Sequence, residues 1–559
     1  MLWFDEAGEV VEMFRNSFPL SFLFFVPIFI LISPVDHVGA AHDFTVYRMQ
    51  QFDLQGSQYG CRNTLVSLDA RHIDAKVLTR RCVLAKLKEL TLDRFRDLKN
   101  VGAGALVVLL PSLRDKMTLE EKQHLMELES GLLTEETQMP VYFTPTTDEL
   151  MDIYGSIRNS VNSDQASSAT EALLSSATAN GFQFVISGSQ SKVKSDFKIP
   201  NIQGKLSGSG IEEQLPTIAI VAHYDAFGVA PGLSVGGDSN GSGVIALMEI
   251  ARLFSKLYSN ARTHAKFNFL FLLSGGGKFN YQGTKKWIEE NLDNMESSLL
   301  TDVSFVLCLD TIGSEDELYL HVSKPPKDGS HGAIFLKNLE SVSNEFYPEM
   351  KFAMNHKKIN LANDMLAWEH ERFSFRRLPA FTLSRMDSHR NLTRTSITDQ
   401  RSSVDISKLR RNIHVMVEAL ARQVYGIVNT EQLEIFNDAL DVQEHVISSW
   451  LDILVSQPRP AQLLDTSHPL INTMHDAMEQ FLKDVKIIEV KADKRDPEYV
   501  FYDGEQFSMH AYNVKPAVFD LFLGLLIAGY IYLMYLLVQN FNWIRAVTKS
   551  VLSQKPKTQ

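Results

Sequence analysis

Cysteine is scarce in this chain, with three residues, Cys61, Cys82 and Cys308, among 559. So few thiols exclude a disulfide framework of the kind that holds small secreted domains together. A single bond between Cys61 and Cys82 stays open, whereas Cys308 lies in an apolar run and is predicted to be a buried free thiol. The chain also lacks a large basic block outside its C-terminal tail, and its formal net charge is -12, which argues against nucleic-acid binding.

Long hydrophobic runs are equally few, and the two that exist lie near the ends of the chain. Residues 18–33 form an apolar run of signal-peptide length, preceded by Arg15 and followed by small residues. We therefore predict a signal peptide over 1–41, with a retained anchor as the alternative, because acidic residues precede the run. Residues 521–544 contain no charged side chain. That length is enough to cross a bilayer, so one transmembrane helix is predicted over 516–544.

The charge that follows the second run sets the predicted topology. The tail, 545–559, contains Arg545, Lys549, Lys555 and Lys557 and no acidic residue. Because positive segments stay on the cytosolic side, the tail is predicted to be cytosolic and everything before the span lumenal. Lys555 and Lys557 stand fifth and third from the end, which resembles a dilysine retrieval signal read by a receptor. The sequence thus predicts a single-pass type I protein of the endoplasmic reticulum membrane.

Between the two runs, short strands alternate with helices, and no internal repeat is visible. Thr118 and Glu121 have the spacing of a capping box before a helix predicted over 119–133. The predicted lumenal segments are a small N-terminal α/β unit (42–158), a Ser- and Ala-rich linker (159–180), a larger α/β domain (181–426) and a helical and juxtamembrane segment (427–515).

The larger domain is organised around residues 217–243, TIAIVAHYDAFGVAPGLSVGGDSNGSG. Its apolar run ends in His223 and Asp225, and a Gly-rich loop then leads into a helix with apolar residues at helical spacing. Further apolar strands follow, separated by helices, which predicts a three-layer, mostly parallel α/β sheet. The other predicted strands are 182–186 and 202–206 as a hairpin, 267–273, 303–309, 318–322 as an edge strand, and 380–383.

The polar residues at the ends of these strands are of the types that bind metal ions. A two-metal hydrolase needs about five nitrogen or oxygen ligands, including a bridging carboxylate, and a separate carboxylate as general base. The sequence offers His223, Asp225, Asp238 and Asp310 at one edge of the predicted sheet, where α/β proteins place their active sites. At the loop where a pair of carboxylates would be needed, it has the run Gly275–Lys278.

These landmarks resemble the zinc aminopeptidase family, which includes transferrin-receptor-like proteins and nicastrin, over about 203–425. The family's ligand loops correspond to five segments of this chain: His223–Asp225, Ser239–Gly243, Gly277–Thr284, Leu309–Gly313 and Thr395–Asp399. The resemblance implies a fold of the zinc aminopeptidase type for the larger domain.

Compared residue by residue, most of the family's metal site is missing. The first ligand corresponds to His223, and one terminal carboxylate corresponds to Asp310. The replaced positions are Ser239 for the bridging aspartate, Gly277 for the general-base glutamate, Lys278 for the next ligand and Thr395 for the last histidine. Because the Lys278 ammonium repels a cation, the resemblance implies a pseudo-peptidase with no catalytic metal and no cofactor, in which His223 and Asp310 are vestigial ligand positions.

One alternative hypothesis retains a peptidase activity. In that hypothesis the protein is a residual metal-dependent peptidase whose ligands are rebuilt from His223, Asp225, Asp238, Asp310 and His389. Asp238 has the charge of the bridging ligand but is one residue out of register, and His389 lies six residues before the position of the family's histidine. Metal analysis of the purified protein separates the two hypotheses.

Further segments narrow the resemblance to the nicalin-like proteins, which are non-peptidase relatives of nicastrin: 44–56, 360–373, 491–503 and 513–521. This resemblance covers nearly the whole chain. It implies a non-catalytic scaffold of the endoplasmic reticulum membrane, in a translocon-associated complex that supports biogenesis of multipass membrane proteins and modulates Nodal signalling. The implied partners are a Nodal modulator-type lumenal glycoprotein, a small multipass membrane protein and the Sec translocon. In such a lumenal domain, the sequons at Asn391 and Asn240 are predicted glycosylation sites.

Overall fold

The structure is a computed structural model that describes residues 41–111, 116–163, 181–293, 299–360, 362, 365–427, 433–493, 495, 497–514, 517–540, 543 and 546. These residues belong to two compact units. The larger unit comprises described residues of 44–151 and 184–509, and the smaller unit comprises those of 41–43, 152–183 and 510–546. Nearly all of the predicted signal peptide, most of the predicted linker, and Lys555 and Lys557 lie outside the described residues.

An eight-stranded mixed sheet forms the centre of the larger unit. Its strands are β10 (Lys198–Leu206), β11 (Thr217–His223), β12 (Asn268–Ser274), β13 (Val303–Leu309), β14 (Glu317–Val322), β15 (Lys351–His356), β16 (Ala380–Ser384) and β17 (Lys483–Lys491). They lie in the order β15-β14-β16-β13-β11-β12-β10-β17. The four central strands are parallel, with β11 between β12 and β13 and with β13 beside β16. Antiparallel pairing adds β10 and β17 on one side and β14 on the other.

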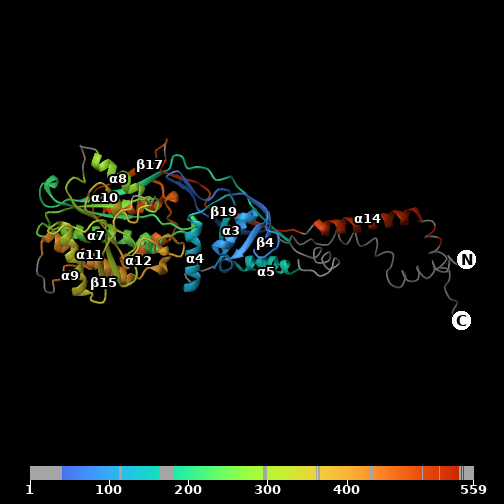
Figure 1. Ribbon diagram of the computed structural model, residues 1–559, viewed down its shortest axis with the longest axis horizontal. Helices are drawn as coiled ribbons and strands as arrows, with labels where there is room; N and C mark the ends of the chain where they lie inside the picture. The colour runs from blue at the N-terminus through green and yellow to red at the C-terminus, as the bar shows by residue number, and fades with distance from the viewer. Residues whose placement is uncertain are drawn as a thin grey trace. The chain divides into compact units, whose positions relative to one another are not determined.

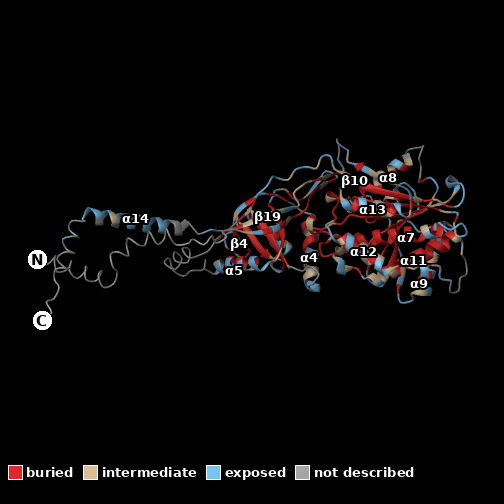
Figure 2. Ribbon diagram, turned by 180° about the vertical axis from the view of Figure 1, so that it is seen from behind, coloured by how far each residue is buried: buried red, intermediate tan, exposed pale blue. Residues whose placement is uncertain are grey.

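Helices cover both faces of this sheet. The helices of the larger unit after β11 are α7 (Gly243–Tyr258), α8 (Gln282–Asp293), α9 (His331–Phe346), α10 (His370–Phe375), α11 (Ile406–Tyr425), α12 (Glu444–Val455) and α13 (Pro469–Glu479). Successive residues of β11 point to opposite faces, so Ile220 packs in the apolar cluster of α7, α9 and α11, and Val221 in that of α8 and α10. Figure 1 shows the two helical layers. α7 is buried over most of its length, as Figure 2 shows.

A second sheet closes into a barrel of seven strands in the order β1-β19-β9-β4-β5-β6-β8. Their bounds are β1 Ala41–Arg48, β4 Val66–His72, β5 Cys82–Lys86, β6 Ala105–Leu110, β8 Val141–Pro145, β9 Gly181–Ile186 and β19 Gln506–Val514. Two helices, α3 (Leu92–Val101) and α4 (Leu119–Leu132), contribute to the apolar core beside β5 and β6. The predicted capping box of α4 is confirmed: the Thr118 side chain accepts a hydrogen bond from Glu121 N, and Glu121 Oε2 accepts one from Thr118 N.

A small four-stranded sheet, made of β2 (Gln51–Leu54), β3 (Ser57–Cys61), β7 (Glu136–Thr137) and β18 (Tyr499–Phe501), lies in the order β18-β2-β3-β7. Its aromatic side chains pack on the loops that follow β11 and β12. Phe279 makes ring contacts with Phe52 at 5.3 Å, Phe227 at 5.4 Å and Phe501 at 4.7 Å. This aromatic cluster joins the N-terminal strands to the loop edge of the eight-stranded sheet.

The smaller unit contains most of α5 (Asp148–Ser163) and all of α14 (Ala517–Gln539). The leucine side chains of α14 are exposed, for example Leu521, Leu525 and Leu526. Among the residues that the structure describes, no helix combines the length and hydropathy needed to cross a membrane.

The structure differs from the sequence-based expectations in several elements. The predicted hairpin of 182–186 and 202–206 does not form, because β9 joins the barrel and β10 joins the eight-stranded sheet. β14, predicted as an edge strand, lies between β15 and β16, and the edge strand on that side is β15, which the sequence did not predict. The segment 427–515, predicted as helical and juxtamembrane, also supplies β17, β18 and β19. Cys61 and Cys82 are buried free thiols, as is Cys308.

Candidate functional site

The predicted ligand residues gather at the carboxyl ends of β11 and β13, where the sheet is parallel. His223 ends β11 and Asp310 follows β13, while Asp225 and Asp238 lie in the loops between β11 and α7. All four side chains are buried, with exposures between 0% and 2%. The structure therefore brings the four predicted residues to one edge of the sheet, and their side chains are enclosed by the protein.

The loop after β12 has no room for a general base. A Cβ atom built at Gly277 would lie 2.4 Å from both Cβ and Cγ of His223, which is closer than real Cβ atoms approach. Asp225 fixes the backbone there, since its carboxylate accepts hydrogen bonds from Gly277 N at 2.7 Å and Lys278 N at 3.1 Å. Asp225 is thus an anchor of this loop, and a glutamate at position 277 requires the histidine to move.

Asp310 is paired with an arginine that the sequence analysis did not identify. Arg394 Nη2 donates to Asp310 Oδ2, and Thr311 Oγ1 donates to Asp310 Oδ1 at 2.6 Å. Burial alone would raise the pKa of Asp310, but the charges of Arg394, Lys278 and His223 outweigh it and hold that pKa well below its usual range. The carboxylate is therefore ionised, and its counter-ion is a guanidinium of the same chain.

Arg394 makes several further contacts. Its Nη1 donates to the carbonyls of Ala367 and His389, each at 3.2 Å, and Nη2 also donates to the Tyr281 hydroxyl at 3.2 Å. Its guanidinium lies 4.5 Å above the centre of the Trp368 ring, a cation–π geometry. These contacts fix the arginine beside Asp310, so the carboxylate is not available as an open ligand.

A second cation lies beside the position of the bridging ligand. Lys278 Nζ donates to Ser239 Oγ at 2.6 Å. Burial lowers the pKa of Lys278 to about 8, against the raising effects of Asp310, Asp225 and Asp399. The place of a bridging carboxylate between two metal ions is thus taken by a hydroxyl group that accepts from an ammonium group.

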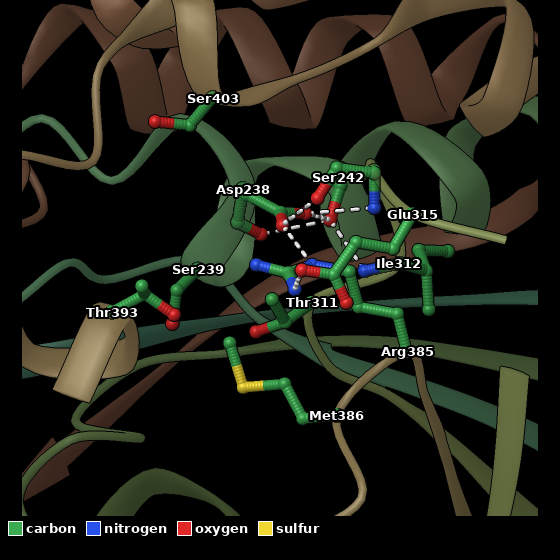
Figure 3. Close-up of polar contacts among 12 residues, drawn as sticks. Asp238, Ser239, Ser242, Thr311, Ile312, Glu315, Arg385, Met386, Thr393 and Ser403 are labelled. Carbon is green, nitrogen blue, oxygen red and sulfur yellow. Dashed lines mark hydrogen bonds and ion pairs between the residues drawn. The ribbon is translucent and has the colours of Figure 1, made fainter. Parts of the chain in front are cut away.

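The contacts of Asp238 are structural. Its Oδ1 accepts from Gly313 N at 2.7 Å and from Ser242 Oγ at 2.8 Å, and its Oδ2 accepts from Arg385 Nε at 2.7 Å. Figure 3 shows this cluster, with Arg385 also paired to Glu315 at 2.8 Å. Asp238 therefore ties the start of α7 to the loops after β13 and β16 and is not a substitute bridging ligand.

Asp399, the last acidic residue of the family's motifs, serves the same loop. Its carboxylate accepts from Asp238 N at 3.0 Å and from Ser239 N at 2.7 Å. Burial, and then the nearby charge of Asp238, raise the pKa of Asp399 to about 6. The carboxylate thus holds the Asp238–Ser239 backbone in place.

His223 has a buried carboxylate partner that sequence reasoning missed. Its Nδ1 lies 3.3 Å from Glu369 Oε2, and Glu369 Oε1 accepts from Ser274 Oγ at 2.7 Å and Thr284 Oγ1 at 2.5 Å. Nε2 of His223 has no hydrogen-bond partner among the described residues. No local sequence pattern identifies Glu369, because it and His223 are 146 residues apart in the chain.

Two further predicted residues, His389 and Asn240, make contacts that do not fit their predicted roles. His389, in the rebuilt-ligand hypothesis, lies 3.2 Å by its Nδ1 from Lys357 Nζ, and burial and then the charges of Lys357 and Arg394 lower its pKa to about 4. Asn240 is fully buried and donates to the carbonyls of His223 and Leu309. A glycan on Asn240 is incompatible with that geometry, which corrects the expectation from its sequon.

Asn391, the other predicted glycosylation site, is exposed. It begins a short 3-10 helix (Leu392–Thr395), and its side chain accepts a hydrogen bond from Thr393 N. This is a surface position that a glycan can occupy, and glycosylation there stays a prediction. Thr395, which stands in place of the last histidine, lies in the same short helix and offers no nitrogen ligand.

The residues present do not fit the two zinc ions of the related aminopeptidases. Of the family's five ligands, His223 and Asp310 remain, and Asp310 is neutralised by Arg394. The only cluster of three metal-ligating side chains within the described ranges is His475, Asp476 and Glu479, on α13 and distant from these residues in sequence. No catalytic step through a metal ion can be derived from these groups.

The N-terminal part of the larger unit closes over the site's loops. Glu129 of α4 is buried, and its Oε1 accepts from Val229 N at 3.0 Å and Ile397 N at 3.1 Å, while Ser396 Oγ donates to its Oε2. Val229 and Leu233 also pack in the apolar core of α3 and α4. The loops at the edge of the sheet are thus internal packing surfaces in this protein.

Comparison with known proteins agrees with this geometry. Residues 201–414 match Peptidase family M28. The chain is 52% identical to the BOS complex subunit ncln of Danio rerio, over 99% of this chain and 100% of that protein. It is 29% identical to Nicalin of Caenorhabditis elegans, over 97% of this chain and 99% of that protein.

Among solved structures, the γ-secretase component Nicastrin has the same fold. The TM-score is 0.58 at 12% sequence identity, and the match covers 84% of this chain and 99% of that chain. At this identity the likeness concerns the fold alone. The full-length identity to the two relatives, together with the M28 match of the central domain, shows that this chain belongs to the nicalin family, which is related to the M28 peptidases.

Proposed function

We propose that this protein is a non-catalytic scaffold subunit of a BOS-type complex in the endoplasmic reticulum membrane. The observation that carries the proposal is the replacement of the metal site by internal cations: Arg394 neutralises Asp310, and Lys278 binds Ser239. The contact between Gly277 and His223 removes the space for a general base as well. A site with these contacts stabilises the fold and supplies no chemistry.

The names of the relatives support the assembly part of the proposal. The zebrafish relative is named as a BOS complex subunit, and the two chains match over their full lengths. On the resemblance to nicalin-like proteins, we further propose that this chain works in a translocon-associated complex that supports multipass membrane protein biogenesis and modulates Nodal signalling. Its proposed partners are a Nodal modulator-type lumenal glycoprotein, a small multipass membrane protein and the Sec translocon.

The proposed membrane attachment is a single span over 516–544, with the larger unit in the lumen and the tail in the cytosol. Residues 521–544 carry no charge, and α14 exposes its leucines, as a helix in contact with lipid does. Lys555 and Lys557 are the proposed retrieval signal. Replacing both lysines with Ser should let the protein acquire Golgi-type glycans when it is expressed alone; unchanged glycans would contradict the proposed signal.

The enzymatic half of the proposal is tested by metal and activity measurements on the purified full chain. We expect sub-stoichiometric zinc by elemental analysis and no chelator-sensitive release of amino acids from peptides, with an active zinc aminopeptidase measured in parallel as the positive control. Stoichiometric zinc that is lost in a His223→Ala variant would instead support the residual metal-dependent peptidase.

The assembly half is tested by co-purification. Replacing 519–544 with an unrelated single-span helix should release the multipass partner while the larger unit keeps its melting temperature. His223→Ala should leave co-purification intact in folded protein, because His223 is buried and cannot touch a partner. If the span exchange changes nothing and His223→Ala in a folded protein abolishes assembly, the scaffold proposal is wrong.

A further inference from the structure

A hollow of about 710 Å³ opens at the end of the eight-stranded sheet opposite the vestigial site. Ser304, at the amino end of β13, and Ala380, which begins β16, line it, whereas Asp310 follows the carboxyl end of β13. Its walls come from the loop between β14 and α9, the segment after β15 and the segment after α10. Its volume is within the range of ligand-binding pockets, about 300–1,000 Å³.

The rim of this hollow is cationic. Lys324, Lys327, Lys358 and Arg377 line it and are exposed, and its described lining residues include no acid. None of these four cations forms an ion pair with a described residue. The neighbouring Asp328 is exposed but does not line the hollow. In a chain with a formal net charge of -12, four unpaired cations around one hollow make a local positive field that attracts anionic ligands.

The floor of the hollow is apolar and closely packed. Phe381 and Ala380 are buried there, and Pro325 and Pro326 form part of the wall. A Cβ at Gly332, in the first turn of α9, would lie 2.6 Å from the Phe381 ring, so glycine lets the helix start directly against this floor. The amino end of α9 adds positive potential on one side of the hollow.

From this combination we infer that the hollow binds an acidic peptide segment of a partner protein, with an apolar side chain on the floor and flanking carboxylates at the rim. An apolar centre inside a polar rim is the usual anatomy of a protein recognition site. The cations are exposed and come from three separate segments. They therefore suit several carboxylates spaced along a chain better than one enclosed phosphate group. This site is independent of the membrane span and of the vestigial metal centre.

The test uses the purified full chain in detergent and a panel of fluorescently labelled peptides. Each peptide has a central Phe or Leu flanked by Asp and Glu, and a charge-reversed peptide with Lys at those positions is the ligand control. We expect saturable binding of acidic peptides by fluorescence anisotropy, weakened by salt. Lys324→Glu with Lys327→Glu should reduce the affinity at least about tenfold, because both reversals repel the carboxylates.

The matched protein control is Lys266→Glu with Lys337→Glu, which makes the same change of charge at exposed lysines outside the hollow. This variant should bind acidic peptides as the unchanged protein does, and both variants should keep its melting temperature. Equal loss of affinity in the two variants, or no binding of any acidic peptide, would overturn the inference.

Three further outcomes would assign the hollow to a different occupant and overturn the peptide inference. Displacement of bound peptide by equimolar inorganic phosphate would indicate a small-anion site. Equally tight binding to phosphatidylserine vesicles that is lost in the Lys324 and Lys327 variant would indicate a membrane surface. Self-association that this variant abolishes, measured by sedimentation, would indicate a second copy of the chain.

Discussion

The replacement Arg394→Met tests whether the vestigial site now stabilises the fold. It leaves the buried Asp310 carboxylate without its guanidinium partner, while the methionine keeps part of the apolar contact with the Trp368 ring. Removing one partner of a buried ion pair costs about 3–5 kcal/mol, because the other charge stays buried and uncompensated. For a unit of this size that loss corresponds to a fall in melting temperature of roughly 3–6 °C.

The assay is thermal unfolding of the purified full chain, followed by intrinsic fluorescence at neutral pH. Arg390→Met is the matched control, because Arg390 is exposed and lies four residues away on the same loop; its effect should stay within about 0.5 kcal/mol. Adding Asp310→Asn to Arg394→Met should recover part of the loss, since the double variant buries no unpaired charge. The two changes should therefore show a coupling energy of about 2 kcal/mol or more.

The pH dependence of the free energy of unfolding gives an independent test of the Asp310–Arg394 pair. The folded-state pKa of Asp310 lies below its unfolded value of about 3.9, so its stabilisation is present above that pH and is lost as the pH falls through the folded pKa. In Arg394→Met the folded-state pKa of Asp310 rises. The difference in free energy of unfolding between the unchanged protein and this variant should therefore narrow on acidification from about pH 7 to about pH 4. A pH-independent gap, or a loss below about 1 kcal/mol at neutral pH, would refute the reasoning.

Three other predictions concern the loops around this pair. Gly277→Ala should lower stability by about 1–3 kcal/mol through overlap with His223, and His223→Ala in the same chain should relieve part of that loss in thermal unfolding. Glu129→Ala should cost about 2–4 kcal/mol, because it leaves buried N–H groups without an acceptor, whereas the exposed Glu127→Ala should change little; equal melting temperatures would contradict this role. Burial lowers the folded pKa of Lys278 to about 8, so the unfolded state binds more protons above that pH and stability should rise there; Lys278→Met should flatten this rise in a series of melting temperatures across alkaline pH.

Local patterns predicted the elements whose stability is local. The capping box of α4 and the apolar periodicity of α7 depend on residues within one or two helical turns. α4 begins at the predicted residue, Leu119, and α7 is the helix predicted after the Gly-rich loop. The strand β11 was equally visible, because it is buried on both faces and reads as a continuous apolar run. Its end fixed the positions of His223 and Asp225 in the site.

Elements that depend on distant partners were not predictable in this way. β15 has the sequence KFAMNH, with exposed or half-buried side chains, so its strand state follows from pairing with β14. β17 is paired with β10, almost 300 residues earlier in the chain. The separation of β9 and β10 into different sheets has the same cause: strand partners are chosen by burial across the whole fold, which a local window does not contain.

The same limit applies to the site. The missing metal ligands and general base could be predicted from the motifs, since Ser239, Gly277 and Lys278 stand where the family has acidic residues. The new contacts of Asp310 with Arg394 and of His223 with Glu369 could not be predicted, because these residues meet only in the folded chain. A buried rim, covered by Glu129 of α4, likewise follows from tertiary packing. This packing leaves the loops of the old pocket unavailable as a surface for partners.

The order of strands in the barrel has a consequence for how the chain acquires its structure during synthesis. β1 lies beside β19, and Arg48 contacts Asp503, 455 residues further along the chain. At ribosomal rates of about 5–20 residues per second, the first strand therefore waits on the order of 20–90 s for its neighbour. Over that interval one side of β1 exposes unpaired backbone groups to the surroundings. The N-terminal barrel is the first part of the described chain to be made and among the last to close, so its folding time is governed by the length of the domain inserted between its strands.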